Sequence, residues 1–244
     1  MPLYLLIIAI QVALVVHVFK TGRNTYWVWA IAMLPLVGSI AYIIVEILPG
    51  LMRSRGARRA VANVHRTIDP GRDLRKAERQ LRMTDSIDTR RKLAEHLLEA
   101  GRYDEAIEGF RGALVGLYQH DPILMLGLAR AQFGKGRAGD ARQTLDELIA
   151  RNPEFKSPEG HLLYARALEE EGDKDKALRE YETLSKYFSG AEAKYRYAVL
   201  LKQMGRQPQA RGMLEQLLED AELASDFYRR QQKEWLEKAR RELN

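Results

Sequence analysis

The stretch that decides the fold is "ARAQFGKGRAGDARQTL", residues 129–145, in which Gly134 and Gly136 flank Lys135. A glycine-rich run beside a basic residue occurs in phosphate-binding loops, and also in tight turns between helices. A phosphate-binding loop of the Walker type requires Gly-Lys-Ser or Gly-Lys-Thr after a buried strand. Neither tripeptide occurs in the chain, and the residues before Gly134 have a helical pattern. The stretch is therefore predicted to be a turn between two helices.

The same arrangement recurs along the chain with a nearly constant period. At four nearly evenly spaced positions a glycine is followed five residues later by an alanine, and these successive glycines are 35, 36 and 33 residues apart. A period of this length is typical of stacked helix pairs, since one pair cannot bury its apolar face alone. The four glycine and alanine positions are Gly101 and Ala106, Gly136 and Ala141, Gly172 and Ala177, and Gly205 and Ala210.

Two further positions repeat with the same register. A large residue precedes an alanine on each first helix: Leu93-Ala94, Leu128-Ala129, Tyr164-Ala165 and Tyr197-Ala198. A large apolar residue lies one turn after each alanine of the second helix: Phe110, Leu145, Tyr181 and Leu214. This pattern resembles the tetratricopeptide repeat, a pair of antiparallel helices about every 34 residues. The tryptophan that the family often has near the start of a repeat is absent.

The resemblance implies an all-α protein with a tetratricopeptide-like solenoid. We expect four repeats over residues 87–220. Residues 221–244 are expected to form a C-terminal capping helix, because apolar residues such as Leu236 and Ala239 recur among charged ones. Residues 51–86 are expected to form a basic juxtamembrane helical connector or a degenerate first repeat, and the pattern leaves both interpretations open.

The first fifty residues contain two long apolar runs, residues 3–19 and 26–48. A helix of about 20 apolar residues matches the roughly 30 Å hydrocarbon core of a bilayer. Tyr26, Trp27 and Trp29 at the start of the second run are residues that favour the membrane interface. The two runs are therefore expected to form a transmembrane hairpin over residues 1–50.

The second run contains "WAIAMLPLVGSIAYIIVEILPG", residues 29–50, with a Leu-Pro-Leu-x-Gly element and an aromatic residue after it. This segment resembles the N-terminal membrane segment of bacterial cardiolipin synthases and related members of the phospholipase D–nuclease family. The resemblance does not extend to the chemistry of that family, which depends on a His-x-Lys-x4-Asp motif. None of the five histidines has a lysine two positions later.

Basic residues are concentrated after the second apolar run. Residues 51–82 contain ten Lys or Arg against three Asp or Glu. Such a cluster attracts anionic lipid headgroups, and nucleic acid is disfavoured because no aromatic residues are interleaved. The residues expected to contact lipid headgroups are Arg53, Arg55, Arg58 and Arg59. Because positive charge favours the inner side, the soluble part is expected at the cytoplasmic face of a bacterial inner membrane.

A partner-binding groove is expected on the first helices of the repeats. Arg130 and Arg166 occupy equivalent places in neighbouring repeats, and such a pair suits a carboxylate or an acidic peptide segment. Ordinary solvated arginines that pair with nearby glutamates are the alternative. The residues expected to line the groove are Arg91, Lys92, Leu126, Arg130, Phe133, Arg166, Tyr195 and Arg196.

The sequence gives no sign of an enzyme. Cysteine is absent, the histidines do not pair at metal-ligand spacing, and no catalytic arrangement is recognisable, so we expect no catalytic residue, metal or cofactor. The preferred hypothesis is a membrane-anchored adaptor that binds a protein or peptide partner in its groove. The alternative is a component of envelope or phospholipid biogenesis that acts through the membrane hairpin, with the repeats as accessories.

Overall fold

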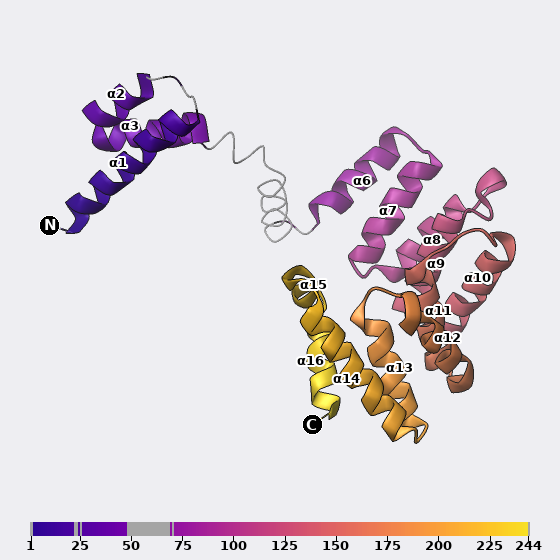
Figure 1. Ribbon diagram of the computed structural model, residues 1–244. Helices are drawn as coiled ribbons and strands as arrows, with labels where there is room; N and C mark the ends of the chain where they lie inside the picture. The colour runs from indigo at the N-terminus through magenta and orange to yellow at the C-terminus, as the bar shows by residue number, and fades with distance from the viewer. Residues whose placement is uncertain (1, 22–23, 25, 48–68, 70, 244) are drawn as a thin grey trace. The chain divides into compact units, whose positions relative to one another are not determined.

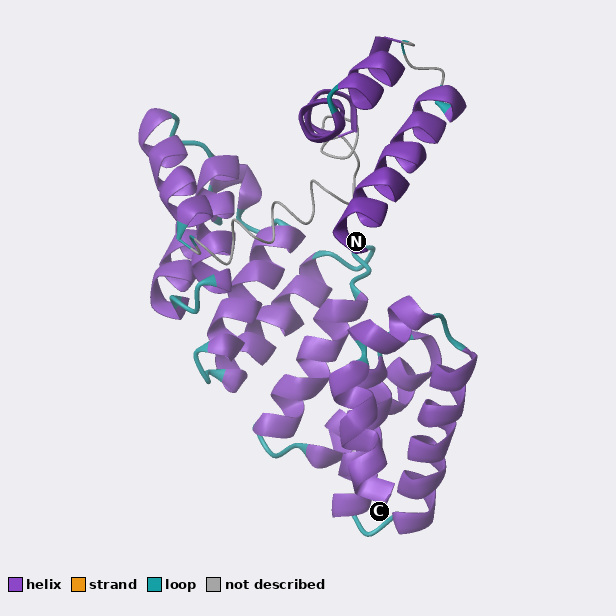
Figure 2. Ribbon diagram, turned by 90° about the vertical axis from the view of Figure 1, so that its left-hand side faces the viewer, coloured by secondary structure: helices purple, strands orange, loops and turns teal. Residues whose placement is uncertain are grey.

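The computed structural model describes residues 2–21, 24, 26–47, 69 and 71–243, which form helices joined by turns (Figure 2). No strand occurs in this part of the chain, as the prediction of an all-α protein requires. The chain divides into two compact units, Met1–Arg72 and Asp73–Asn244, called here the N-terminal unit and the repeat unit.

The repeat unit consists of helix pairs that follow one another along the chain (Figure 1). Helix α6 (Arg72–Met83) comes first. The pairs are α7 (Ile87–Glu99) with α8 (Tyr103–Ala113), α9 (Pro122–Gly134) with α10 (Ala138–Arg151), α11 (Pro158–Glu170) with α12 (Lys174–Tyr187), and α13 (Ala191–Gln203) with α14 (Gln207–Leu223). A short 3₁₀ helix, Gly116–Tyr118, lies between α8 and α9.

Each pair is joined at one of the glycines that define the period. Gly101, Gly136, Gly172 and Gly205 all have positive φ, between 73° and 86°. At the end of α9, the N–H of Gly136 donates to the carbonyl of Phe133 at 2.8 Å, and the N–H of Arg137 donates to Gln132 at 2.9 Å. These bonds satisfy the last carbonyls of the helix in a geometry that a residue with a Cβ resists. The stretch that suggested a phosphate loop is therefore a helix–helix turn.

The alanines of the repeat lie where two helices cross. Ala106, Ala141 and Ala177 have no exposed surface, and Ala210 is 2 % exposed. The large residues one turn later, such as Phe110 and Tyr181, are also buried. Small and large side chains alternate at these positions, so the backbones approach closely while the core stays filled.

The C-terminal segment is two helices rather than one. Helix α14 continues to Leu223, and α15 (Asp226–Gln231) and α16 (Lys233–Leu243) follow it. Ser225 caps α15 by accepting a hydrogen bond from the N–H of Tyr228. Leu236 and Ala239 of α16 are buried in a cluster with Leu214 and Leu217 of α14, so α16 covers the last repeat.

The N-terminal unit consists of α1 (Pro2–Lys20), α2 (Tyr26–Met33), α3 (Pro35–Tyr42) and a π-helical turn, Ile43–Ile47. Leu14, Val18, Ile31 and Tyr42 form its small core. Polar side chains join the helices: His17 Nδ1 and the Tyr42 hydroxyl are 3.0 Å apart, and the Gln11 amide donates to the Ile31 carbonyl at 2.9 Å.

The structure corrects the prediction of two membrane spans over residues 3–19 and 26–48. Of the described helices, none combines the length and the apolar character needed to cross a membrane. The second run is interrupted, because Pro35 starts a new helix and leaves α2 and α3 with 8 residues each. The assignment to a bacterial inner membrane with a cytoplasmic soluble part is therefore wrong, and the hypothesis of action through a membrane hairpin loses its premise.

Candidate functional site

Two of the predicted groove residues are already neutralised by their own helix. On α7, the Arg91 guanidinium donates to Asp88 at 2.8 Å and to Glu95 at 2.7 Å. The Lys92 ammonium lies 2.6 Å from the second oxygen of Asp88. These pairs are one helical turn apart, as salt bridges on a helix surface commonly are. This end of the predicted groove has little unpaired positive charge.

Tyr195 and Arg196 on α13 belong to a network with the C-terminal helix. The Arg196 guanidinium lies 2.7 Å from Glu192 and 3.5 Å from Glu169, and its carbon is 5.4 Å from the centre of the Trp235 ring. Tyr195 packs beside the same tryptophan, with ring centroids 5.5 Å apart. Arg196 therefore has a structural role, since it joins α11, α13 and α16.

Glu169 also accepts a hydrogen bond from a buried phenol. The Tyr181 hydroxyl donates to Glu169 at 2.7 Å, and the tyrosine has no exposed surface. Burial, and next the negative charge of Glu169, hold the pKa of Tyr181 well above its ordinary value. The Glu169 carboxylate, which partly neutralises Arg196, is thus held in place by a buried tyrosine of the repeat core.

Among the described residues, the arginines at the centre of the predicted groove have fewer ion-pair partners than those at its two ends. The Arg166 guanidinium of α11 lies over the Phe133 ring of α9, with 4.7 Å between its carbon and the ring centroid. Its Nη1 is 3.6 Å from Glu192, and its Nε is buried with no hydrogen-bond partner in the described part of the chain. Arg130 lies one turn before Phe133 and is exposed, and the described residues provide no ion pair for it. Arg130, Phe133 and Arg166 are called here the central groove site.

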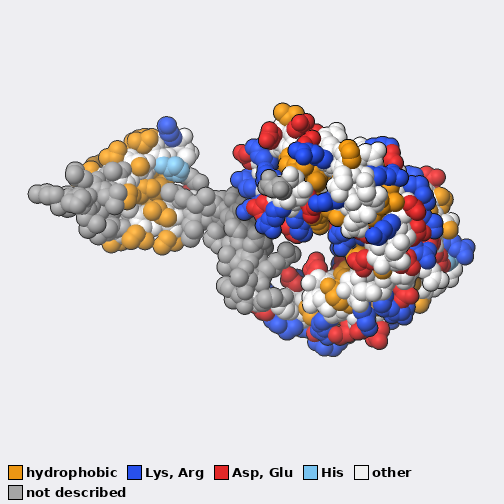
Figure 3. All heavy atoms as spheres, turned by 90° about the horizontal axis from the view of Figure 1, so that it is seen from below, with side chains coloured by type: hydrophobic (Ala, Val, Ile, Leu, Met, Phe, Trp, Pro, Cys, Tyr) orange, Lys and Arg blue, Asp and Glu red, His pale blue; other side chains and the backbone are white. Residues whose placement is uncertain are grey.

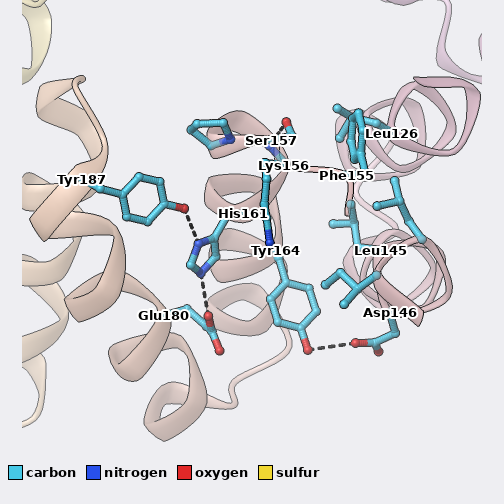
Figure 4. Close-up of a pocket in the computed structure, with 14 residues that line it drawn as sticks. Leu126, Leu145, Asp146, Phe155, Lys156, Ser157, His161, Tyr164, Glu180 and Tyr187 are labelled. Atoms are coloured by element: carbon cyan, nitrogen blue, oxygen red, sulfur yellow. Dashed lines mark hydrogen bonds and ion pairs between the residues drawn. The ribbon is translucent and has the colours of Figure 1, made fainter. Parts of the chain in front are cut away.

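Leu126, the remaining predicted groove residue, lines a separate cavity. This cavity of about 560 Å³ is bounded mainly by α10, α11, α12 and the loop before α11 (Figure 4). It is called here the inter-repeat pocket. Its lining is mostly apolar, with Leu145, Leu148 and Phe155 among the contributing residues. Pockets of this size and composition are typical of binding sites.

Three polar contacts brace the inter-repeat pocket. Nδ1 of His161 lies 2.6 Å from the Tyr187 hydroxyl, and its Nε2 lies 2.6 Å from Glu180. The Tyr164 hydroxyl donates to Asp146 at 2.9 Å. Burial, and next the hydrogen bond to Asp146, raise the pKa of Tyr164 to about 12. Because α11 is tied in this way to both neighbouring second helices, the pocket has fixed walls.

Charged residues of both signs are distributed over the repeat unit (Figure 3), but most pairs are local. The sequence could have indicated His161 and Tyr164 as neighbours, because residues three apart share a helix face. It does not indicate Glu180 and Tyr187, which reach the pocket from the next helix. Arg53, Arg55, Arg58 and Arg59, predicted to contact lipid headgroups, lie outside the described residues.

Comparisons with known proteins agree with this architecture. Three family models of the tetratricopeptide repeat match the chain, over residues 97–159, 158–183 and 192–221. The prediction of tetratricopeptide repeats is thereby confirmed. The predicted likeness of the first fifty residues to the cardiolipin synthase segment is not shown, since these matches all lie in the repeat unit. No curated protein matches the sequence.

Several solved structures with similar folds are distant from this chain in sequence. A crystal structure of MamA has 21 % identity and a TM-score of 0.54, covering 61 % of this chain and 86 % of its own. A MamA RS-1 double mutant has 14 % identity and a TM-score of 0.57, covering 69 % and 95 %. A thermophilic tetratricopeptide repeat protein of Thermus thermophilus has 23 % identity and a TM-score of 0.50, covering 67 % and 88 %. These likenesses concern the fold.

Proposed function

We propose that the repeat unit is a protein-interaction module and that its central groove site binds an acidic segment of a partner protein. The proposal involves no catalytic step. The repeat unit acts by binding its partner, and so raises the local concentration of whatever the partner carries. The tetratricopeptide repeats support an interaction role, and the geometry of Arg130, Phe133 and Arg166 supports the chemistry of the partner.

The observation that carries the proposal is the incomplete pairing of Arg166. Its Nε is buried without a hydrogen-bond partner in the described part of the chain, and its contact to Glu192 is long at 3.6 Å. A buried donor without a partner costs about 1–3 kcal/mol, so Arg166 is incompletely satisfied within the described part of the chain. Glu192 also pairs with Arg196, at 2.7 Å. Its ion pair with Arg166 is therefore the longer and weaker of the two.

Arg130 adds a second cation, on the same helix as Phe133. It precedes Phe133 by three residues, so both side chains lie on one face of α9. The Phe133 ring contacts the Arg166 guanidinium, and this contact reduces the entropy lost when a carboxylate binds. Planar guanidinium groups suit two-pronged recognition of carboxylates.

The test measures binding of a labelled peptide with several consecutive glutamates to the full chain by fluorescence anisotropy. Arg130→Gln and Arg166→Gln are each expected to weaken binding about tenfold, the effect of losing roughly 1.4 kcal/mol. Arg91→Gln is the matched control, because it removes the same charge from a first helix where the arginine is already paired.

Equal weakening by Arg91→Gln and Arg130→Gln would show that the peptide responds to overall charge rather than to the central groove site. An unchanged affinity in both Arg130→Gln and Arg166→Gln would contradict the proposal.

A further inference from the structure

We propose that the inter-repeat pocket is a second binding site, which takes a cationic side chain, arginine or lysine, from a basic segment of a partner protein. The proposal does not rest on the central groove site, because Arg130, Phe133 and Arg166 do not line the pocket. The central groove site would bind an acidic segment, and the inter-repeat pocket would bind a basic one.

The apolar part of the pocket suits the aliphatic stem of such a side chain. Leu145 and Leu148 are buried in its wall, while Ile149 and Tyr187 are 55 % and 50 % exposed at its edge. Arginine and lysine bury their methylene groups against apolar surface and keep the charged end at polar groups. The exposed apolar edge gives the residues next to the cation a surface to cover.

The polar part of the pocket carries negative charge. Asp146 and Glu180 both line it, and Lys156 is the one Lys or Arg among its described lining residues. Figure 4 shows both carboxylates at the same end of the pocket, on either side of Tyr164. Glu180 bonds to His161 through one oxygen, and its other oxygen accepts no hydrogen bond within the described part of the chain, so it is open to an incoming donor.

The tyrosines of the pocket respond to the same negative charge. After burial, Glu180 and Glu159 are the next causes that raise the pKa of Tyr187. Glu180 also contributes to the raised pKa of Tyr164, which Arg142 opposes. Arg142 pairs with Asp146 and with Glu171, at 2.5 Å each, whereas Glu180 has no ion pair with a Lys or Arg in the described part of the chain. Charge complementarity therefore favours a cationic occupant.

The walls are arranged before binding. His161 is held between Tyr187 and Glu180, its ring stacked on Tyr187 with centroids 5.9 Å apart, and Tyr164 is held by Asp146. The rings of Tyr164 and Tyr187 offer faces on which a guanidinium or ammonium group can lie. A site that needs no rearrangement loses less free energy on binding.

The positive charge of Lys156 distinguishes a cationic from an acidic occupant of the pocket. Lys156 is exposed and lines the pocket, and no ion pair of Lys156 lies within the described residues. A cationic occupant is repelled by this ammonium, so Lys156→Ala should strengthen binding about threefold, as expected for an exposed charge pair. An acidic occupant would instead lose affinity.

The probe is a labelled peptide with one arginine between two leucines in a Gly-Ser background, titrated against the full chain. A second peptide carries citrulline, the uncharged analogue of arginine, at the same position. The arginine peptide should bind saturably and about tenfold more tightly than the citrulline peptide, since a hydrogen bond to a charged group contributes about 1.5–3 kcal/mol.

Glu180→Gln should weaken binding of the arginine peptide about tenfold, because the amide still accepts from His161 but has no charge. Glu182→Gln is the matched control: it removes the same charge from α12 at a residue that pairs with Lys186 and does not line the pocket.

Three results would overturn the proposal: no saturable binding of the arginine peptide, equal affinity for the arginine and citrulline peptides, or weaker binding by Lys156→Ala. The outcome is separable from the central groove site. Arg130→Gln should leave the arginine peptide unaffected, and Glu180→Gln should leave the polyglutamate peptide unaffected.

Discussion

The N-terminal unit and the repeat unit are both helical and both rich in apolar residues, but they use those residues differently. In the repeat unit, alanines and large apolar residues recur at fixed positions and are buried at helix crossings. In the N-terminal unit, the described residues include a small core of Leu14, Val18, Ile31 and Tyr42, while Val12, Phe19 and Trp29 are more than half exposed. Position in a repeat therefore determined burial more reliably than membership of an apolar run.

The largest expected effect compares the two buried tyrosines. Tyr181→Ala should lower the free energy of unfolding of the repeat unit by about 3–5 kcal/mol, the usual cost of removing a buried aromatic ring. Tyr42→Ala removes an equally buried ring from the N-terminal unit and should leave the repeat unit's unfolding unchanged. Urea denaturation is followed by the fluorescence of Trp235, with Trp27 and Trp29 replaced by phenylalanine.

If Tyr42→Ala lowers the stability reported by Trp235 as much as Tyr181→Ala does, the two units do not unfold separately. The contrast between them would then be lost.

A smaller effect is expected at Gly127, inside α9. A Cβ at this position would collide with the Phe110 ring of the preceding repeat. Gly127→Ala should therefore destabilise the repeat unit by about 1–3 kcal/mol, the cost of overpacking a filled core. The same denaturation experiment measures it, and Gly212→Ala in α14 is the control, because a Cβ there meets open space. A neutral result for Gly127→Ala would mean that the repeats pack more loosely than the structure shows.

Gly136→Ala isolates the backbone contribution from packing. No atom lies within 4 Å of a Cβ at this position, but the residue has a φ of +81°. The left-handed conformation should cost alanine about 1 kcal/mol, which thermal unfolding can detect. Gly136→Asn should recover part of this loss, since asparagine tolerates the conformation better. Full stability of Gly136→Ala would show that the period does not depend on glycine at its turns.

These glycines and alanines show why the repeat was predictable from the sequence. The turn at Gly136 and the crossing at Ala141 are requirements of local geometry that recur four times, so each supports the others. The membrane interpretation rested on the length of two apolar runs. In the structure, Pro35 starts a new helix within the second run and leaves α2 with 8 residues.

The binding surfaces were predicted only in part. The sequence indicated which residues lie on the first helices, and Phe133 and Arg166 do meet. It did not show that Arg196 is engaged by Glu169, because that contact joins side chains of two different helices. The inter-repeat pocket was missed since its walls come from several helices, and their approach depends on the loop that contains Phe155.

The smallest expected effect is a change in the pKa of Tyr164 at the inter-repeat pocket. Burial and the bond to Asp146 raise the pKa of Tyr164 from 10.0 to about 12. The neutral phenol is therefore favoured by folding. Its contribution to stability is complete below pH 10 and is lost as the pH rises through about 12. Asp146→Asn should lower this pKa toward 10.0, observed by NMR of ¹³C-labelled tyrosine with Tyr164→Phe used to assign the signal. An unchanged pKa in Asp146→Asn would contradict the proposed role of that carboxylate.

The contrast between the two units is tested most directly by hydrogen exchange of backbone amides, resolved along the full chain. Amides that open only by global unfolding exchange slowest, and such amides lie in extensive cores. We predict the slowest exchange around Ala141, Ala165 and Ala177, at the helix crossings of the central repeats, with faster exchange throughout α1, α2 and α3. Protection of α1 to α3 equal to that of the central repeats would contradict the conclusion that the repeated positions provide the stable core of this protein.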